Sequence, residues 1–249
     1  MKAFIRPFFG LLCLAVTASA QPAAAPDMTA GPAPKGKPWE AGWGFWPKVP
    51  QAWQQTHQSM LKKTQAGGIE VLFLGDSITA GWSGAGKGVW ASNYEPLKAA
   101  NFGIGGDTTR QIIWRIENGE LDGLKPKVVV LMIGVNNIFQ NNGTDEEIAK
   151  GVSEVIKRIQ EKTPDSKILL QSILPLKAEV FDKRVQSVNA LVKEIRGPQI
   201  TWFDLTGTFR GADGKSITDL YVEDGTHLGP KGYEVWAKEL TPKLNGLLK

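Results

Sequence analysis

The sequence predicts a three-layer α/β/α sandwich with a flavodoxin-like parallel sheet of about five strands in the order 2-1-3-4-5. Short β-branched, apolar runs alternate with helical stretches, a pattern typical of βαβ units on a parallel sheet. Polar or glycine-containing turns follow the first three runs, and open parallel sheets bind ligands at such strand ends. The chain contains no internal repeat.

The strands are expected at the apolar runs themselves. Four runs are clear, and a fifth, around Ala100–Phe102, is weaker. In chain order, the clear runs are IEVLFL at 69–74, KVVVLMI at 127–133, KILLQSI at 167–173 and QITWF at 199–203.

The helices are predicted from their start and stop signals. Thr144 and Glu147 form a capping box, and the helix that they open should run to about Gln160, before Thr163-Pro164. The remaining expected helices are a segment around His57, one opening at Asp107-Thr108, one from about Val180 to Arg196 that ends at Gly197-Pro198, and one beginning near Pro230.

The N-terminal 20 residues have the features of a secretory signal peptide. Two cations precede an apolar stretch, and a small-x-small ending at residues 18–20 predicts cleavage before Gln21. The apolar stretch is shorter than the roughly 20 residues of a membrane span. Residues 21–38 have the Pro, Ala and Gly composition of a flexible linker. We therefore expect a signal peptide at 1–20, a linker at 21–38 and one domain at 39–249, in a periplasmic or secreted protein.

Composition excludes several function classes. The only cysteine, Cys13, lies in the signal segment, so the core of the mature domain must hold without disulfides. Without Lys2 and Arg6, the 29 Lys and Arg residues fall to 27 against 25 Asp and Glu, a net charge of about +2. This balance does not favour binding to nucleic acid or to an acidic membrane surface.

Two histidines are available as a catalytic base. His57 has no carboxylate within a helical turn, which disfavours a catalytic role. His227 follows Asp224 by three residues in the loop YVEDGTHLGP. That spacing lets the carboxylate accept the Nδ1–H of the ring and leaves Nε2 free as a base. The alternative is that His227 caps the last helix near Gly229.

Ser77 is the candidate nucleophile, because it comes immediately after the first strand in LFLGDSITAG. A serine in such a turn is more often only a cap, so this position alone is weak evidence. Thr79 stands where a Gly-x-Ser-x-Gly elbow requires glycine, which argues against an ordinary α/β-hydrolase.

Two further loops strengthen the serine hypothesis. Gly105 and Gly106 follow the second strand, where backbone N–H groups can point at an anion, and Asn136 follows the third. In the order 2-1-3 these residues and Ser77 project from adjacent strand ends and could form an oxyanion hole. The alternative is that the glycines permit a tight turn and Asn136 caps it.

The four segments GDSIT (75–79), GIGGDT with Gly106, GVNN with Asn136 and DGTH (224–227) resemble the ordered blocks of the SGNH, or GDSL, hydrolase family. The chain is most similar to the platelet-activating-factor acetylhydrolase catalytic subunits and their bacterial relatives, through NFGIGGDTTRQIIWRIENGEL and KPKVVVLMIGVNN. The resemblance implies that 39–249 is an SGNH-type hydrolase domain. It implies Ser77 as nucleophile, Asp224 and His227 as its partners, and Ser77, Gly106 and Asn136 as oxyanion donors.

The sequence departs from the family pattern at two positions. Asn137 stands where many members have Asp, so a role for that carboxylate does not carry over. Thr226 precedes His227, where the acetylhydrolase subunits often have a bulky apolar residue. This difference suggests a more polar acyl or alcohol pocket.

Competing chemistries fit less well. GWSGAGKG at 81–88 has Gly88 where a phosphate-binding loop needs Ser or Thr, and it begins well beyond the strand. One credible histidine and no mature cysteine leave too few ligands for zinc, so we expect neither metal nor cofactor. The Trp-rich tract PWEAGWGFWPKVPQAW, with Trp39, Trp43, Trp46 and Trp53, could instead form a secreted carbohydrate-binding module, although packing against the domain is favoured.

We therefore expect an exported carboxylic ester hydrolase that removes short acyl groups, acetyl above all, with an O-acetylated carbohydrate as a natural substrate. Lysophospholipase or thioesterase activity of the same family is the alternative. The expected partner is a small-molecule, carbohydrate or lipid ester, without stable membrane insertion. The sequence does not predict an oligomeric state.

Overall fold

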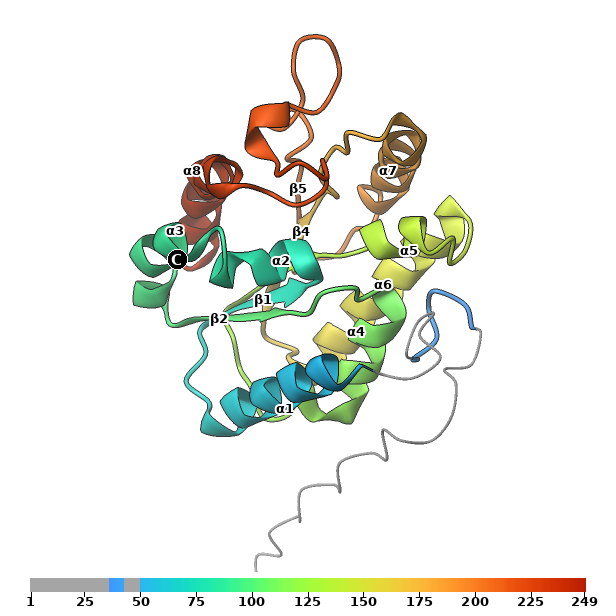
Figure 1. The fold of residues 1–249 in the computed structure, drawn as a ribbon. Coiled ribbons are helices and arrows are strands. Elements are labelled where there is room, and N and C mark those ends of the chain that lie inside the picture. The colour runs from blue at the N-terminus through green and yellow to red at the C-terminus, as the bar shows by residue number, and fades with distance from the viewer. Residues whose placement is uncertain (1–35, 43–49) are drawn as a thin grey trace, which may run out of the picture.

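The computed structural model describes residues 36–42 and 50–249 (Figure 1). The expected signal peptide, most of the expected linker, and Trp43 and Trp46 lie outside these residues. Residues 36–38, which were assigned to the linker, contact the domain: Thr109 Oγ1 donates to Pro38 O over 2.6 Å, and Lys37 Nζ lies 2.5 Å from Glu147 Oε1. Within the described ranges, no helix combines the length and apolarity needed to cross a membrane.

The sheet has five parallel strands in the order β2-β1-β3-β4-β5, which confirms the predicted fold class. Strands β1 and β3 are buried along their whole length, as expected for central strands covered on both faces. All five predictions agree with the observed ends to within two residues. The strands are Val71–Gly75 (β1), Ala99–Gly103 (β2), Val128–Met132 (β3), Lys167–Gln171 (β4) and Ile200–Phe203 (β5).

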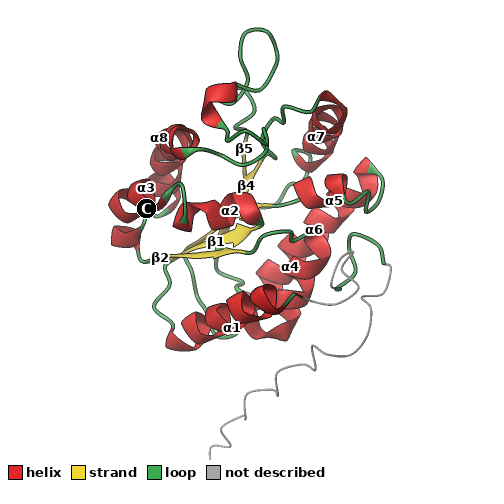
Figure 2. Ribbon diagram, in the orientation of Figure 1, coloured by secondary structure: helices red, strands yellow, loops and turns green. Residues whose placement is uncertain are grey.

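Helices cover both faces of the sheet (Figures 1 and 2). Helices α4, α6 and α7 pack side by side on one face, α3 and α8 lie on the other, and α1 packs beside the turn that follows α4. The helices are Gln51–Ala66 (α1), Ser77–Ala80 (α2), Lys87–Asn93 (α3), Thr109–Arg115 (α4), Val135–Phe139 (α5), Asp145–Lys162 (α6), Glu179–Val192 (α7) and Pro230–Leu247 (α8).

The helix signals in the sequence were mostly accurate. The capping box of α6 is present, with Glu147 N donating to Thr144 Oγ1 and Thr144 N donating to Glu147 Oε2. Helix α7 ends at Val192, earlier than the expected Arg196, because the next backbone bonds tighten: Ile195 N donates to Val192 O. The short helices α2, α3 and α5 were not predicted, since four to seven residues are too few for a helical apolar pattern.

The strand register brings three chain segments together at one edge of the sheet. Gly75 at the end of β1 lies opposite Gly103 of β2 and Met132 of β3. The packing there is close: a Cβ on Gly75 would lie 2.4 Å from Met132 O, and one on Gly103 would lie 2.2 Å from Ala80 N. Glycine is therefore required at both strand ends, and the loops that follow emerge side by side.

Candidate active site

Ser77 is the first residue of α2, and only Asp76 separates it from the end of β1. Asp76 caps this short helix, and its Oδ1 accepts a hydrogen bond of 2.9 Å from Ile78 N. Tyr233 of α8 donates to Ile78 O over 2.7 Å, which also holds this turn in place. Ser77 itself is only partly buried, so its hydroxyl is available for chemistry.

His227 and Asp224 occupy a tight turn in the loop before α8. Asp224 Oδ1 accepts hydrogen bonds from the backbone N–H groups of Thr226 (2.8 Å) and His227 (2.9 Å). Gly225 has φ +64°, and a Cβ at this position would lie 2.3 Å from Lys177 Cβ. Both facts require glycine between Asp224 and His227.

The side chains of this turn reach Ser77. His227 Nδ1 lies 2.6 Å from Asp224 Oδ2, and His227 Nε2 lies 2.8 Å from Ser77 Oγ. With the Asp224 carboxylate ionised, His227 Nδ1 carries the proton and donates a hydrogen bond to it. His227 Nε2 therefore accepts a hydrogen bond from the Ser77 hydroxyl. The fold thus brings Ser77 and His227, which are 150 residues apart in the sequence, into contact.

The Asp224 carboxylate is suited to stay charged. Its partial burial acts to raise its pKa, but the hydrogen bonds from His227 and from the two backbone N–H groups outweigh that effect and lower the pKa. The His227 and Asp224 side chains are 46% and 48% exposed. The Asp224 and His227 side chains therefore face solvent, unlike the buried end of β1.

The glycine loop after β2 and the start of α5 lie beside Ser77. A Cβ on Gly105 would lie 3.8 Å from Ser77 Cβ, and Gly106 has φ +84°, a conformation that favours glycine. Asn136 Nδ2 donates to Asp107 O over 2.9 Å, and Gln140 Nε2 donates to Gly106 O over 3.2 Å. The structure thus places Gly106 and Asn136 in one hydrogen-bonded unit.

The second histidine lies elsewhere. His57 is 1% exposed in α1, its Nδ1 is 3.3 Å from Glu120 Oε1, and its ring stacks against Trp53. The absence of a carboxylate within its own helical turn was a correct observation, but Glu120 supplies one from a distant part of the chain. His57 does not meet Ser77.

Several residues around the site were not singled out from the sequence. Gln140 holds Gly106, and the buried Asp107 anchors the loop through Trp53 and Arg115. The sequence does show a carboxylate directly after the Gly105-Gly106 pair. Such a carboxylate needs a cationic partner if it is buried, and Arg115 is that partner. Gln140 and Trp53 contact this loop from positions that are 34 and 54 residues away in the sequence.

Asp76 was also overlooked as an ionisable group. Its side chain is 1% exposed, and Oδ2 has no hydrogen-bond partner within the described part of the chain. Burial raises the pKa of Asp76 to about 7, and the nearby charge of Asp107 adds to this effect. Asp76, which adjoins Ser77, is therefore protonated and neutral below about pH 7.

Two further features of the sequence, the glycine-rich segment 81–88 and Asn137, have structural explanations. The segment 81–88 forms a single turn at Gly81–Ser83 and the start of α3, well after the end of β1. Asn137, which replaces an expected Asp, accepts from Thr109 N over 3.1 Å and donates to Thr109 Oγ1 over 3.0 Å. Its role here is to join α5 to α4.

The fold and this constellation define a carboxylic ester hydrolase. The model of the GDSL-like lipase/acylhydrolase family matches residues 73–235, and the chain belongs to that family. It is 34% identical over 203 residues to the human platelet-activating factor acetylhydrolase IB subunit alpha2, covering 79% of this chain and 85% of the relative. The human alpha1 subunit is 31% identical over 201 residues, covering 79% and 84%. The carbohydrate-binding module is therefore disfavoured.

Solved structures agree on the fold. A GDSL-like lipase from Bacteroides thetaiotaomicron superposes with a TM-score of 0.63 at 18% identity, covering 76% of this chain and 97% of that one. A member of the lipolytic G-D-S-L family from Veillonella parvula gives a TM-score of 0.60 at 22% identity, with coverage of 72% and 99%.

Proposed function

We propose that this protein is an exported serine ester hydrolase that removes short acyl groups, acetyl foremost, through an acyl-enzyme. One observation carries the proposal: Ser77 Oγ lies 2.8 Å from His227 Nε2 while His227 Nδ1 lies 2.6 Å from Asp224. A nucleophile hydrogen-bonded to a base that is oriented by a third group is the signature of nucleophilic catalysis.

The chemistry follows from these contacts. His227 Nε2 takes the proton of Ser77 as Oγ attacks the acyl carbon, and the carbonyl electron pair moves onto oxygen. Collapse of the tetrahedral intermediate breaks the ester bond, and the leaving alcohol takes the proton from the imidazolium. Water then attacks the acyl-enzyme by the same route, while the Asp224 carboxylate stabilises the imidazolium.

Three donors are proposed to hold the tetrahedral oxyanion. The Ser77 N–H lies in the first turn of α2 and has no partner within the helix. The Gly106 N–H belongs to the left-handed glycine of the second loop. Asn136 uses one N–H of its amide on Asp107 O, which fixes the rotamer and leaves the other N–H for the substrate. Each such donor contributes about 3 kcal/mol to lowering the barrier.

An acetyl ester of a bulky alcohol is the proposed substrate, with an O-acetylated carbohydrate as the natural example. The names of the relatives describe acetylhydrolases, which supports the acetyl group. The His227 and Asp224 side chains are about half exposed, so an alcohol carried on a large molecule can approach them. Thr226, beside His227, gives this approach a polar side chain.

The substrate assay compares p-nitrophenyl esters of increasing acyl length with acetylated sugars, lysophospholipids and acyl thioesters. We expect the acetyl ester of the sugar to give the highest kcat/KM; preference for lysophospholipids or thioesters would establish the alternative substrate class. Ser77→Ala should fold and lose nearly all turnover, whereas Ser92→Ala, at an exposed serine of α3, should retain it. Full activity of Ser77→Ala would refute the assignment of the nucleophile.

Export is proposed from the N-terminal 20 residues alone. Expression of the full chain in a bacterial host should yield a periplasmic or secreted protein that begins at Gln21. Mass spectrometry of the purified protein tests this, and an intact N-terminus on a protein retained in the cytoplasm would contradict it.

A further inference from the structure

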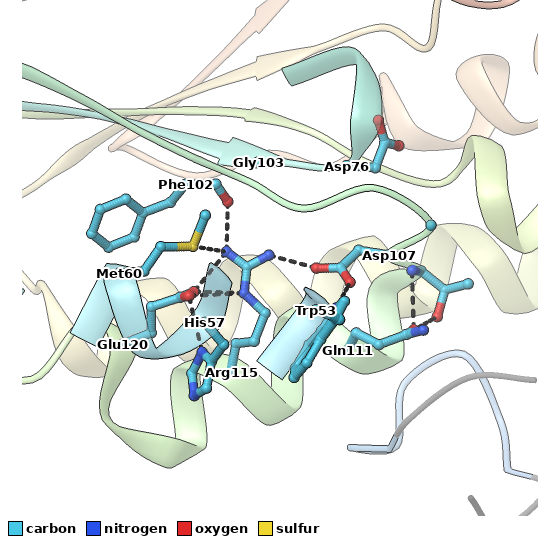
Figure 3. Close-up of polar contacts among 12 residues, drawn as sticks. Trp53, His57, Met60, Asp76, Phe102, Gly103, Asp107, Gln111, Arg115 and Glu120 are labelled. Carbon is cyan, nitrogen blue, oxygen red and sulfur yellow. Dashed lines mark hydrogen bonds and ion pairs between the residues drawn. The ribbon is translucent and has the colours of Figure 1, made fainter. Parts of the chain in front are cut away.

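A buried charged cluster lies directly beneath the loop after β2 that contains Gly106 and Asp107 (Figure 3). Arg115 of α4 contacts Asp107 through Nη1 at 2.5 Å and Glu120 through Nε at 2.8 Å, and its Nη2 donates to Phe102 O. The three charged side chains are all 0% exposed. Water cannot replace a bond lost within this cluster, so its geometry is fixed more firmly than that of a surface ion pair.

The N-terminal helix α1 contributes to the same cluster. Trp53 Nε1 donates to Asp107 Oδ1 over 2.6 Å, and Figure 3 shows the indole lying beside the Asp107 carboxylate. Trp53 is 4% exposed and lies before residue 73, where the family match begins. A residue outside the matched stretch therefore holds the residue that follows Gly106.

Asp107 is held from two sides. Trp53 and Arg115 bind its carboxylate from below the loop, while Asn136 Nδ2 donates to its backbone carbonyl from α5. Gly106 has no side chain of its own, and its N–H direction depends on the peptide units on either side. A shift of Asp107 would thus move two of the proposed oxyanion donors, Gly106 N–H and Asn136 Nδ2, together.

We propose that Trp53 is a positioning residue for ester hydrolysis: through its hydrogen bond to Asp107 it sets the direction of the Gly106 and Asn136 donors. This inference rests on the proposed role of those two donors. Displacement of a catalytic group by about 1 Å can cost roughly 100-fold in rate. The loss would fall on the transition state, because the oxyanion does not exist in the bound ester.

Two substitutions separate the hydrogen bond from the packing. Trp53→Phe keeps an aromatic ring in the stack with His57 but removes the N–H. Trp53→His removes much of the ring, yet its Nε2 occupies the position of the indole Nε1 and can donate to Asp107. Trp236→Phe is the matched control, because Trp236 is 1% exposed in α8 and its Nε1 has no hydrogen-bond partner in the described chain.

The variants are compared with wild type at pH 8 on one ester that the wild type hydrolyses. Burial raises the pKa of Asp107 to about 6, so the carboxylate is ionised at that pH. The affinity of a trifluoromethyl ketone, which adds the nucleophile to form an oxyanion, is measured alongside kcat, KM and the melting temperature.

We expect Trp53→Phe to lower kcat about tenfold or more with KM within about twofold, and to weaken the trifluoromethyl ketone in parallel. Trp53→His should recover part of this loss even if its melting temperature is lower, and Trp236→Phe should keep wild-type kcat. Wild-type kcat in Trp53→Phe, or activities that follow melting temperature across all three variants, would overturn the inference. Failure of the proposed function is distinguishable, since it would appear as full activity in Ser77→Ala or Asn136→Ala.

Discussion

The buried carboxyl group of Asp76, beside Ser77, leads to a quantitative prediction about stability. Asp76 has a folded-state pKa of about 7 against 3.8 for an unperturbed carboxyl, because burial disfavours its charged form. The folded protein therefore retains a proton that the unfolded chain releases. Stability from this group is complete below about pH 4 and is lost as the pH rises through 7. A shift of about 3 units corresponds to about 4 kcal/mol of unfolding free energy.

Asp76→Asn removes this titration while conserving the cap. The amide Oδ1 can still accept from Ile78 N, and Nδ2 replaces the carboxyl oxygen that has no partner. The substitution carries a penalty for burying an unpaired amide, about 1–3 kcal/mol, which does not depend on pH. From pH 4 to pH 8, the stability of the variant relative to wild type should therefore rise by up to about 4 kcal/mol.

Urea unfolding at pH values between 4 and 8, followed by tryptophan fluorescence, measures this difference. Ser92→Ala is the control, because this exposed serine of α3 contacts neither Asp76 nor His227, and its difference from wild type should be constant with pH. Parallel stability curves for Asp76→Asn and wild type would refute the assignment of a proton to Asp76 near neutral pH.

The other predictions concern catalysis and helix capping. Asn136→Ala should lower kcat roughly 100-fold or more with little change in KM, and a pure KM effect would instead place Asn136 in substrate binding. Asp224→Asn should lower kcat by roughly 1,000-fold or more with little change in melting temperature, because Nδ1 loses its acceptor; unchanged kcat would refute the role of Asp224. Thr144→Ala should cost about 1 kcal/mol in urea unfolding, since the capping bond to Glu147 N is lost, and an unchanged midpoint would contradict that role.

The sequence predicted the sheet and the contacts among Ser77, Asp224 and His227 because their signals are local. A buried strand needs only a short apolar run, and the Asp224–His227 contact follows from a three-residue spacing in one turn. The position of Ser77 after a strand predicts exposure at the sheet edge, and the fold indeed brings Nε2 of His227 to its hydroxyl.

The supporting residues could not be predicted in the same way. Trp53 and Asp107 are 54 residues apart, and His57 and Glu120 are 63 apart, with no periodicity that relates them. In the sequence, Trp53 belongs to a Trp-rich tract for which packing was the favoured interpretation. Its packing is observed, but the hydrogen bond to a buried carboxylate appears only when α1 is placed beneath the loop after β2.

The two halves of the candidate site are therefore stabilised by different means. Asp224 and His227 lie in a turn closed by its own backbone hydrogen bonds, so the pair stays oriented while half exposed to solvent. The proposed oxyanion donors come from segments 30 residues apart, and their relative position cannot be fixed locally. Arg115 is suited to fix it, because a buried guanidinium between two carboxylates loses several kcal/mol if one partner is removed. If His227 is the base, its exposed side chain leaves room for varied leaving alcohols while the proposed donors beneath it stay fixed, so substitutions at Asp107 should affect kcat far more than the choice of alcohol.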